Sequence, residues 1–209
     1  MATPRPMPMF PLGTVLFPHV LLPLHVFEPR YRLMTQRVLA GDGEFGVVLI
    51  ERGSEVGGGD TRFDIGTAAR VVRAQELPEG GYALTTVGIR RIQVIQWLPD
   101  DPYPLAEVVD IADRKSTDAG AGEAARRRAH RALADLCALY RQLDPRVPDL
   151  PAVSDEPAQA SYEMAALAPI GPLDAQRVLE TVRVEERLAL VADLLDEHAR
   201  TLRADGSLE

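Results

Sequence analysis

His25, Glu28 and Tyr31 are the first residues of the chain whose types and spacing could support chemistry. A carboxylate next to a phenol and an imidazole could hold and transfer a proton at the edge of a pocket. The same stretch also has a structural interpretation, because Glu28 followed by Pro29 is typical of the first turn of a helix. The two interpretations predict different surroundings for these side chains.

The structural interpretation explains more of the pattern. Glu28 is favoured by the positive end of a helix dipole, Tyr31 is expected to point into the core, and Arg30 or Arg32 is expected to form a local ion pair. We therefore predict no catalytic residue in this stretch. The expected role of His25, Glu28, Arg30 and Tyr31 is to form the rim of a groove that binds a partner.

The other histidines and the single cysteine do not indicate a metal site. His19 and His25 lie six residues apart across Pro23 and could approach each other on a bent strand pair, but no third ligand follows at a suitable spacing. Cys137 falls on the apolar face of a predicted helix and is expected to be a core thiol. One cysteine cannot form an intramolecular disulfide. The sequence predicts no metal and no cofactor.

Two catalytic signatures are missing from the sequence. A phosphate-binding loop of the form G-x-x-x-x-G-K-[ST] needs glycines before its lysine, but no glycine lies between residues 94 and 113, ahead of the only lysine, Lys115. The glycines Gly57–Gly59 follow a strand but precede no helical pattern, which favours a mobile loop. Lys115 falls in a predicted linker, where a Ser-Lys protease dyad cannot easily desolvate it. We expect a chain that is not an enzyme.

The charge balance argues against a polyanionic partner. Residues 1–114 hold 11 Arg against 14 Asp and Glu, and residues 115–209 hold 12 basic against 17 acidic residues. Neither half is expected to be attracted to nucleic acid or to an anionic membrane. The apolar stretch Val15–Phe27 is interrupted by two prolines and is shorter than the ~20 residues of a membrane helix. Without a signal-peptide pattern, the expected location is the cytoplasm.

The first half of the chain is predicted to be mainly β. Two proline-containing strands are expected in residues 8–17 and 19–27, and because proline cannot donate to a sheet ladder they should lie at edges or bend. A helix should begin at Glu28–Pro29 and end near Gly41. Further strands are predicted at residues 44–50, 64–77, 82–98 and 105–113, with a bulge near Gly88–Arg91.

The second half is predicted to be helical. A polar linker is expected at residues 115–122, followed by helices at about 123–143, 158–167, 174–181 and 184–203. The expected architecture is therefore α+β, with a β domain in residues 1–114 and a helical domain in residues 123–209.

Several segments resemble a known family. The runs MPMFPLGTVLFPHVLLPLHVFEPRYRLM, FGVVLI, IGTAARVV and GIRRIQVI resemble the N-terminal, substrate-binding domain of Lon-type ATP-dependent proteases, and most closely the stand-alone bacterial proteins of this kind. The segment Leu179–His198 is similar to the helix that ends that region. The resemblance implies a PUA-like β pseudobarrel followed by a helical bundle. One position departs from the family, which usually has glycine where His19 stands, and His costs more than Gly if the turn needs a positive φ.

Three functions compete at this point. The favoured function is a non-catalytic module that binds protein or peptide segments as an adaptor or regulator of proteolysis, through a strand edge or a groove between the domains. The alternative is an RNA-binding PUA-like module, for which Arg90 and Arg91 or Arg126–Arg131 could form a patch, although that idea rests on fold analogy. An enzyme acting on a small molecule, with His25, Glu28, Tyr31 or Arg91 in its site, ranks last. Exposed strand edges also make self-association possible.

Overall fold

The computed structural model describes residues 3–53, 61–78, 80–114 and 119–204. Two compact units make up the chain, Met1–Ala112 and Asp113–Glu209, which we call the sheet unit and the helical unit. The predicted loop at Gly57–Gly59 and the single lysine, Lys115, lie outside the described residues. That residues 1–114 and 123–209 act as separate domains stays a prediction.

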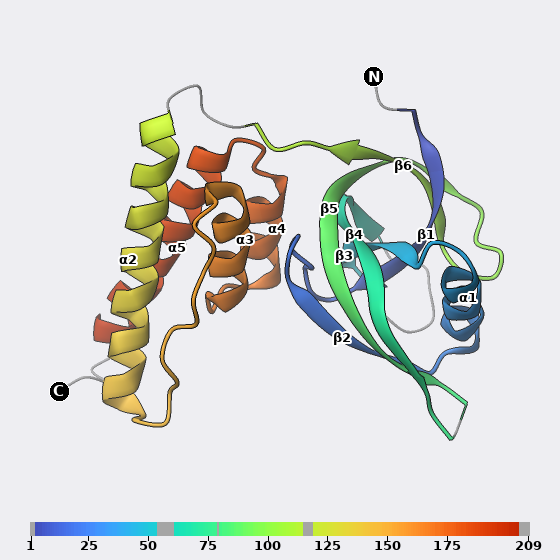
Figure 1. The fold of residues 1–209 in the computed structure, drawn as a ribbon, viewed down its shortest axis with the longest axis horizontal. Coiled ribbons are helices and arrows are strands. Elements are labelled where there is room, and N and C mark those ends of the chain that lie inside the picture. Colours follow the sequence, from blue (N-terminus) through green and yellow to red (C-terminus); the bar gives the residue numbers. More distant parts are fainter. Residues whose placement is uncertain (1–2, 54–60, 79, 115–118, 205–209) are drawn as a thin grey trace. The chain divides into compact units, whose positions relative to one another are not determined.

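The sheet unit forms a near-closed barrel with one early helix (Figure 1). Its strands follow the order β2-β5-β4-β3-β1-β6, and β5 also pairs with β6, so five strands form a ring and β2 pairs with β5 outside it. This arrangement confirms the predicted α+β pseudobarrel. The elements are β1 (Arg5–Leu12), β2 (Leu21–Val26), α1 (Pro29–Ala40), β3 (Glu44–Arg52), β4 (Thr61–Glu76), β5 (Tyr82–Leu98) and β6 (Leu105–Ile111).

Strand β5 has different partners along its two halves. Residues Tyr82–Val87 pair with β2, and Arg91–Leu98 pair with β6, while β4 runs along the other side of both halves. Between the halves, Ala68 and Ala69 of β4 pair with Arg90 and Gly88, so one residue of β5 has no partner. The predicted bulge is therefore confirmed, and it lies where the strand exchanges one neighbour for the other.

Both proline-containing strands were predicted to lie at edges or to bend. Strand β2 lies at an edge, whereas β1 lies between β3 and β6, with a strand on only one side of each of its halves. The first half of β1, up to Pro8, pairs with β6, and the second half, from Met9, pairs with β3. The Met9 N–H donates to the Pro104 carbonyl at 2.8 Å, on the β6 side. Since N–H directions alternate, Pro6 and Pro8 lack a donor toward β3 and Pro11 lacks one toward β6. Each proline therefore lacks its N–H on the side of β1 that has no strand partner at that position.

The turn that leads into β2 has a positive φ at the position where the sequence has His19 and the family usually has glycine. His19 has a φ of 67°, and its N–H donates to the Gly88 carbonyl at 2.7 Å. The Gly88 N–H in turn donates to the Val20 carbonyl at 3.0 Å. A Cβ on Gly88 would collide with the Phe17 carbonyl oxygen, so glycine is required at this close approach. These bonds attach the start of β2 to the bulge of β5.

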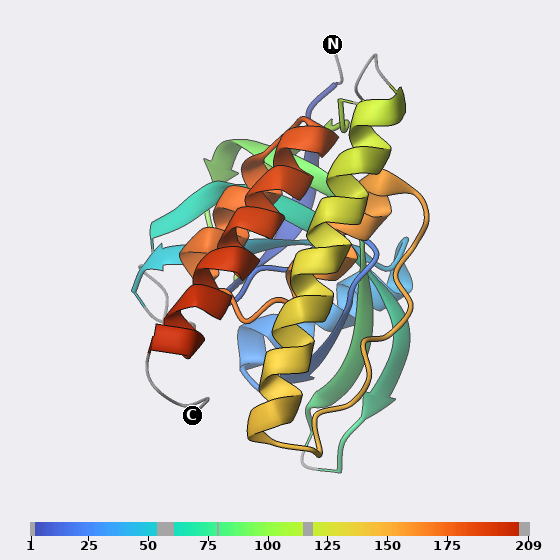
Figure 2. The ribbon, with the colours of Figure 1, turned by 90° about the vertical axis from the view of Figure 1, so that its left-hand side faces the viewer.

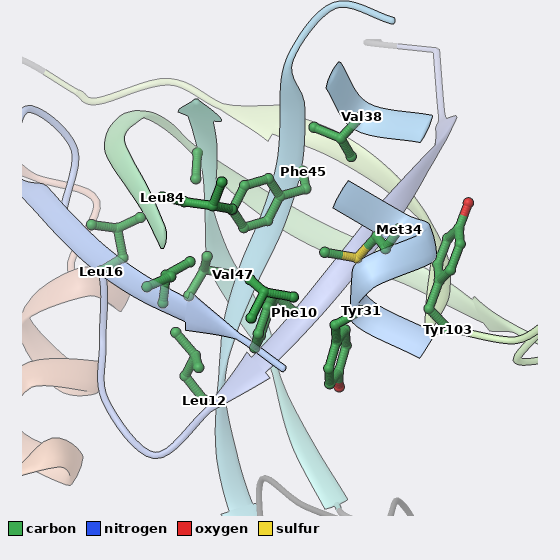
Figure 3. Packing of buried hydrophobic residues seen from close by; sticks show 13 residues of the cluster. Phe10, Leu12, Leu16, Tyr31, Met34, Val38, Phe45, Val47, Leu84 and Tyr103 are labelled. Atoms are coloured by element: carbon green, nitrogen blue, oxygen red, sulfur yellow. The ribbon is translucent and has the colours of Figure 1, made fainter. Parts of the chain in front are cut away.

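Helix α1 has the predicted boundaries, with Glu28 as its N-cap, Pro29 in its first turn and Gly41 after its end. Its buried side chains include Tyr31, Met34 and Val38. The Tyr31 ring stacks on Phe10 of β1, with ring centroids 4.2 Å apart and an angle of 10° between the planes. Figure 3 shows Tyr31 and Met34 pointing from the helix toward the aromatic side chains of β1 and β3. This packing fixes α1 against the barrel.

The helical unit contains α2 (Ala119–Leu143), α3 (Pro157–Leu167), α4 (Pro172–Glu180) and α5 (Val184–Ala204). Helices α2 and α5 run side by side (Figure 2), and α3 contacts both. The predicted helices are confirmed, but α2 begins at Ala119 and not at Glu123, so residues 119–122 of the predicted linker are helical. Residues 115–118 of that linker lie outside the described chain. Gly122 lies near Pro157 of α3. Helix propensity, which is a local property, does not take such tertiary contacts into account.

Arg187 lies in the core of the helical unit with none of its surface exposed. Its guanidinium donates to the Asp113 carboxylate at 2.8 Å, to the Thr181 carbonyl at 2.9 Å and to the Ser161 hydroxyl at 2.7 Å. It also lies 4.0 Å from the centroid of the Tyr162 ring. A buried charge is tolerated only when it is paired and hydrogen-bonded, and this cluster meets that requirement.

Candidate functional site

Two of the open strand edges in the described part of the sheet unit lie close to the start of α1. The second half of β1 is paired only on the side of β3, and β2 is paired only with β5. A hollow of about 170 Å³ is lined by residues from both edges and from the start of α1. We call it the seam hollow. Its lining residues are Phe10, Leu12, Pro23, Leu24, His25, Val26, Phe27, Glu28 and Tyr31.

Three of the four predicted rim residues, His25, Glu28 and Tyr31, line the seam hollow. The fourth, Arg30, stands beside it and donates through its Nε to the Glu28 carboxylate at 3.0 Å. Its guanidinium also lies 4.6 Å from the centroid of the Tyr31 ring. Glu28 is thus paired within the helix start, and Tyr31 is a packed core residue, as the structural interpretation predicted. That these residues bind a partner stays a prediction.

The arrangement of these side chains does not form a proton-transfer set. Among the described residues, His25 forms no hydrogen bond with Glu28 or Tyr31, and Glu28 is already engaged by Arg30. A general acid or base must lie within hydrogen-bond reach of its partner. These three side chains therefore form no acid–base pair with one another.

Leu21 and Phe27 are two apolar side chains of this region that the sequence analysis did not single out. They are 62% and 67% exposed, although both are large and apolar. Along β2, Leu24 and Val26 are buried, while Leu21, Pro23 and His25 are exposed. The signal was available in the sequence, because Leu21 and Phe27 share the parity of Pro23 and His25 along the strand.

The backbone of β2 also presents an open edge. The Val20 carbonyl accepts from the Gly88 N–H, so Val20 faces β5 and, by alternation, the backbone groups of Leu21, Pro23 and His25 face away from it. Pro23 contributes a carbonyl but no N–H. Such an interrupted edge disfavours a long strand pairing between two copies but still allows a short segment to add.

A second hollow, of about 210 Å³, adjoins the first. It shares His25, Val26 and Phe27 with the seam hollow. We call it the Arg32 hollow, after the arginine among its described lining residues. The remaining lining residues are Arg32, Leu77, Gly80 and Gly81.

Arg90, one of the candidate RNA contacts, belongs to a chain of ion pairs across the barrel. It contacts the Glu44 carboxylate at 2.6 Å and Asp110 at 3.0 Å, while Arg70 also contacts Glu44 at 2.6 Å and Arg5 contacts Asp110 at 2.9 Å. Burial alone raises the pKa of the Glu44 carboxyl, but hydrogen bonds and charges of Arg90 and Arg70 outweigh burial and hold the pKa below its ordinary value of 4.5. These cations are already engaged within the protein.

Three of the other candidate cations are also paired or buried. Arg91 is only 2% exposed. On α2, Arg126 contacts Glu123 at 2.8 Å, and Arg128 contacts Asp193 at 2.7 Å, together with a second aspartate of α5. Neutralised surface arginines release few counterions on binding a polyanion, so these positions give little support to an RNA interface.

The histidines and the cysteine do not gather into a metal-binding cluster among the described residues. His19 is in the turn before β2, His25 is exposed on β2, and His198 of α5 hydrogen-bonds the Tyr140 hydroxyl at 2.6 Å. Cys137 is half-buried, less enclosed than the predicted core thiol. Among the described residues, no three His, Cys, Asp or Glu side chains gather where they could hold a metal ion. None of the described helices has the length and apolar character needed to cross a membrane.

Comparison with known proteins identifies similar chains. A family model described as the ATP-dependent protease La (LON) substrate-binding domain matches residues 6–197. The Lon protease of Anaeromyxobacter dehalogenans (strain 2CP-C) is 28% identical over 215 residues, and Lon protease 2 of Myxococcus xanthus is likewise 28% identical over 215 residues. Each alignment covers 99% of this chain and 25% of the relative. The chain therefore spans about a quarter of the length of these curated relatives.

Two solved structures share the fold. The Lon N-terminal domain protein from Xanthomonas campestris superposes with a TM-score of 0.63 at 24% identity, covering 88% of this chain and 95% of that one. The N-terminal domain of the Mycobacterium avium complex Lon protease superposes with a TM-score of 0.67 at 20% identity, covering 93% and 100%. At these identities the likeness concerns the fold.

Proposed function

Because the chain belongs to the family of the ATP-dependent protease La (LON) substrate-binding domain, we propose that it is a non-catalytic module that binds extended protein segments at the seam hollow. In this role it acts as an adaptor or regulator of proteolysis, bringing a bound segment to a protease. The segment lies along the open edge of β2 and places an apolar side chain in the hollow.

The observation that carries this proposal is the coincidence of an open strand edge with an apolar hollow. A segment that adds to β2 gains backbone hydrogen bonds from Leu21 and His25, which depend little on its sequence. Apolar contact with Leu21, Phe27 and the floor of the hollow favours segments that a folded protein normally buries. The two features together suit recognition of unfolded or extended chain.

The charges of the region support a protein partner. The Glu28 carboxylate is compensated by Arg30, so the rim of the seam hollow does not repel an apolar or acidic segment. Most of the arginines that could have contacted RNA are paired or buried. An overall charge of −8 further disfavours a polyanionic chain.

A backbone-modified peptide series tests the proposal. Ten-residue apolar peptides with blocked ends and a fluorescent label are titrated with the full chain, and binding is followed by anisotropy. N-methylation of every second peptide nitrogen is applied in the two alternate registers. We expect one register to abolish binding and the other to preserve it, because only one set of N–H groups faces β2.

Two results would count against this function. If no peptide binds, or if both methylated registers bind as well as the parent, then the open edge of β2 does not hold a strand. RNA that shifts the protein in gels at moderate salt would instead favour the alternative, since non-specific charge contacts weaken steeply with salt.

A further inference from the structure

We propose that the bound segment carries an acidic side chain whose carboxylate pairs with Arg32, next to the apolar residue that fills the seam hollow. This inference rests on the proposed function and names the class of segment that the site prefers. The Arg32 hollow is then a second subsite, selective for Asp or Glu.

The position of Arg32 is determined by its neighbours. Its N–H donates to the Glu28 carbonyl at 2.9 Å, in the first turn of α1. Its guanidinium lies against the turn between β4 and β5, where a Cβ on Gly80 would come within 2.8 Å of the Arg32 Nη2 atom. Gly80 has a φ of 81° and no side chain, so the turn leaves room for the guanidinium at the wall of the hollow.

Arg32 differs from the other arginines of α1 in having no side-chain partner among the described residues. Arg30 donates to Glu28, and Arg37 donates to the Tyr103 hydroxyl at 3.1 Å. For Arg32, by contrast, no hydrogen bond or ion pair of the guanidinium joins it to any described residue. A cation beside the apolar side chains of Val26, Phe27 and Leu77 is less completely hydrated than one in open solvent, so an anion placed there gains more.

A carboxylate fits this subsite better than other anions. The planar guanidinium presents paired donors that match the two carboxylate oxygens. A phosphate backbone would bring a row of charges against a protein of net charge −8, whereas one acidic side chain brings a single charge. The subsite therefore suits an acidic residue inside a protein segment.

The two subsites also set the spacing of the recognised residues. The Arg32 hollow and the seam hollow share His25, Val26 and Phe27 as common walls. A single segment can occupy both only if its apolar and acidic residues are close in sequence, adjacent or one residue apart, because an extended chain advances about 3.3 Å per residue. The preferred motif is thus a short apolar–acidic pair.

Paired peptides and one matched variant test the inference. Blocked peptides that differ only in Glu or Gln beside a central Leu are titrated with the full chain and with Arg32→Gln. The control is Arg37→Gln, which removes the same charge from the last turn of α1, outside both hollows. We expect the Glu peptide to bind the unmodified chain about fivefold more tightly than the Gln peptide. This preference should disappear in Arg32→Gln and persist in Arg37→Gln. A charge exchange, Arg32→Glu with a Lys peptide, should restore tight binding.

The outcomes separate the inference from the proposed function. If the Glu and Gln peptides bind equally, the acidic subsite is wrong and binding of extended segments still stands. If the preference for Glu survives in Arg32→Gln, another cation binds the carboxylate and the assignment to Arg32 is wrong. If an added Leu peptide with an unblocked C-terminus binds more tightly than the blocked Glu peptide, the subsite binds chain ends and not acidic side chains. If neither peptide binds, both the inference and the proposed function fail.

Discussion

Arg187 of the helical unit and Arg32 of the sheet unit are the same residue type in opposite surroundings. Arg187 is fully buried, and its guanidinium is held by Asp113, Ser161 and Thr181. Arg32 is half-buried and lines a hollow, and no hydrogen bond or ion pair of its guanidinium to another described residue is present. A guanidinium that is paired with a carboxylate inside the protein stabilises the fold, whereas one without such a pair among the described residues is available to a ligand.

The same difference separates Tyr31 from Phe27, two aromatic residues close in sequence. Tyr31 is buried and stacks on Phe10, whereas Phe27 is 67% exposed. Both line the seam hollow, one as its packed floor and the other as its open wall. We infer that the site is built on a rigid core and offers only its outer wall to a partner, and the following experiments test that division.

The largest effect is expected from Arg187→Ala. The change removes the cation that pairs with the Asp113 carboxylate in the core and opens a cavity, so the free energy of unfolding should fall by about 4 kcal/mol. Chemical denaturation followed by circular dichroism measures this quantity. Arg183→Ala is the control, because that side chain is 54% exposed and its ion pairs are long, at 3.5 and 3.6 Å. Equal losses in the two variants would contradict the role assigned to the buried cluster.

The next largest effect is expected from Tyr31→Ala. Removing the ring that stacks on Phe10 should cost about 3 kcal/mol of unfolding free energy, because α1 loses a main contact with β1. Tyr31→Phe keeps the ring and should cost less than about 1 kcal/mol. If Tyr31→Ala were as stable as the unmodified chain, the floor of the seam hollow would not be rigid.

Glu44→Gln should remove a dependence of stability on pH. The folded pKa of Glu44 lies below 4.5, so its ion pairs stabilise the folded chain above that pH, and this stabilisation is lost as the pH falls through the lower folded pKa. At pH 7 the variant should lose about 1 kcal/mol. Denaturation curves between neutral pH and pH 3 measure the difference. An unchanged acid slope in Glu44→Gln would show that other carboxylates dominate.

The smallest effect on stability is expected from Phe27→Ser. The exposed ring contributes little to the core, so the free energy of unfolding should change by less than about 0.5 kcal/mol, while peptide affinity should fall about fivefold. Ile95→Ser is the control, since Ile95 is an apolar residue of β5 that is 52% exposed and lines neither hollow. Equal affinity loss in the two variants would mean that general surface apolarity, and not the wall of the seam hollow, determines binding.

Local sequence signals predicted most of the elements. The Glu28–Pro29 helix start, the bulge at Gly88 and the order of strands and helices follow from residue chemistry that acts over a few positions. The position of β1 did not follow, because its prolines indicated an edge. They are tolerated between β3 and β6 because each half of the strand has only one partner, an arrangement that local chemistry does not encode.

Partner binding by the predicted rim residues stays a prediction. Of His25, Glu28, Arg30 and Tyr31, three line the seam hollow and Arg30 lies beside it. The Arg32 hollow could not be predicted, since Arg32 meets Gly80 and Leu77 only when the turn between β4 and β5 folds against α1.

The sequence by itself determined the family, the α+β order of elements and the helix that begins at Pro29. Proline, glycine and apolar periodicity act locally, so one chain is enough to read them. Only the tertiary structure decided which edges stay open. Whether the outer edges of β2 and of the second half of β1 are paired depends on how β5 divides its pairing between β2 and β6. This pairing brings together residues that lie far apart in the chain.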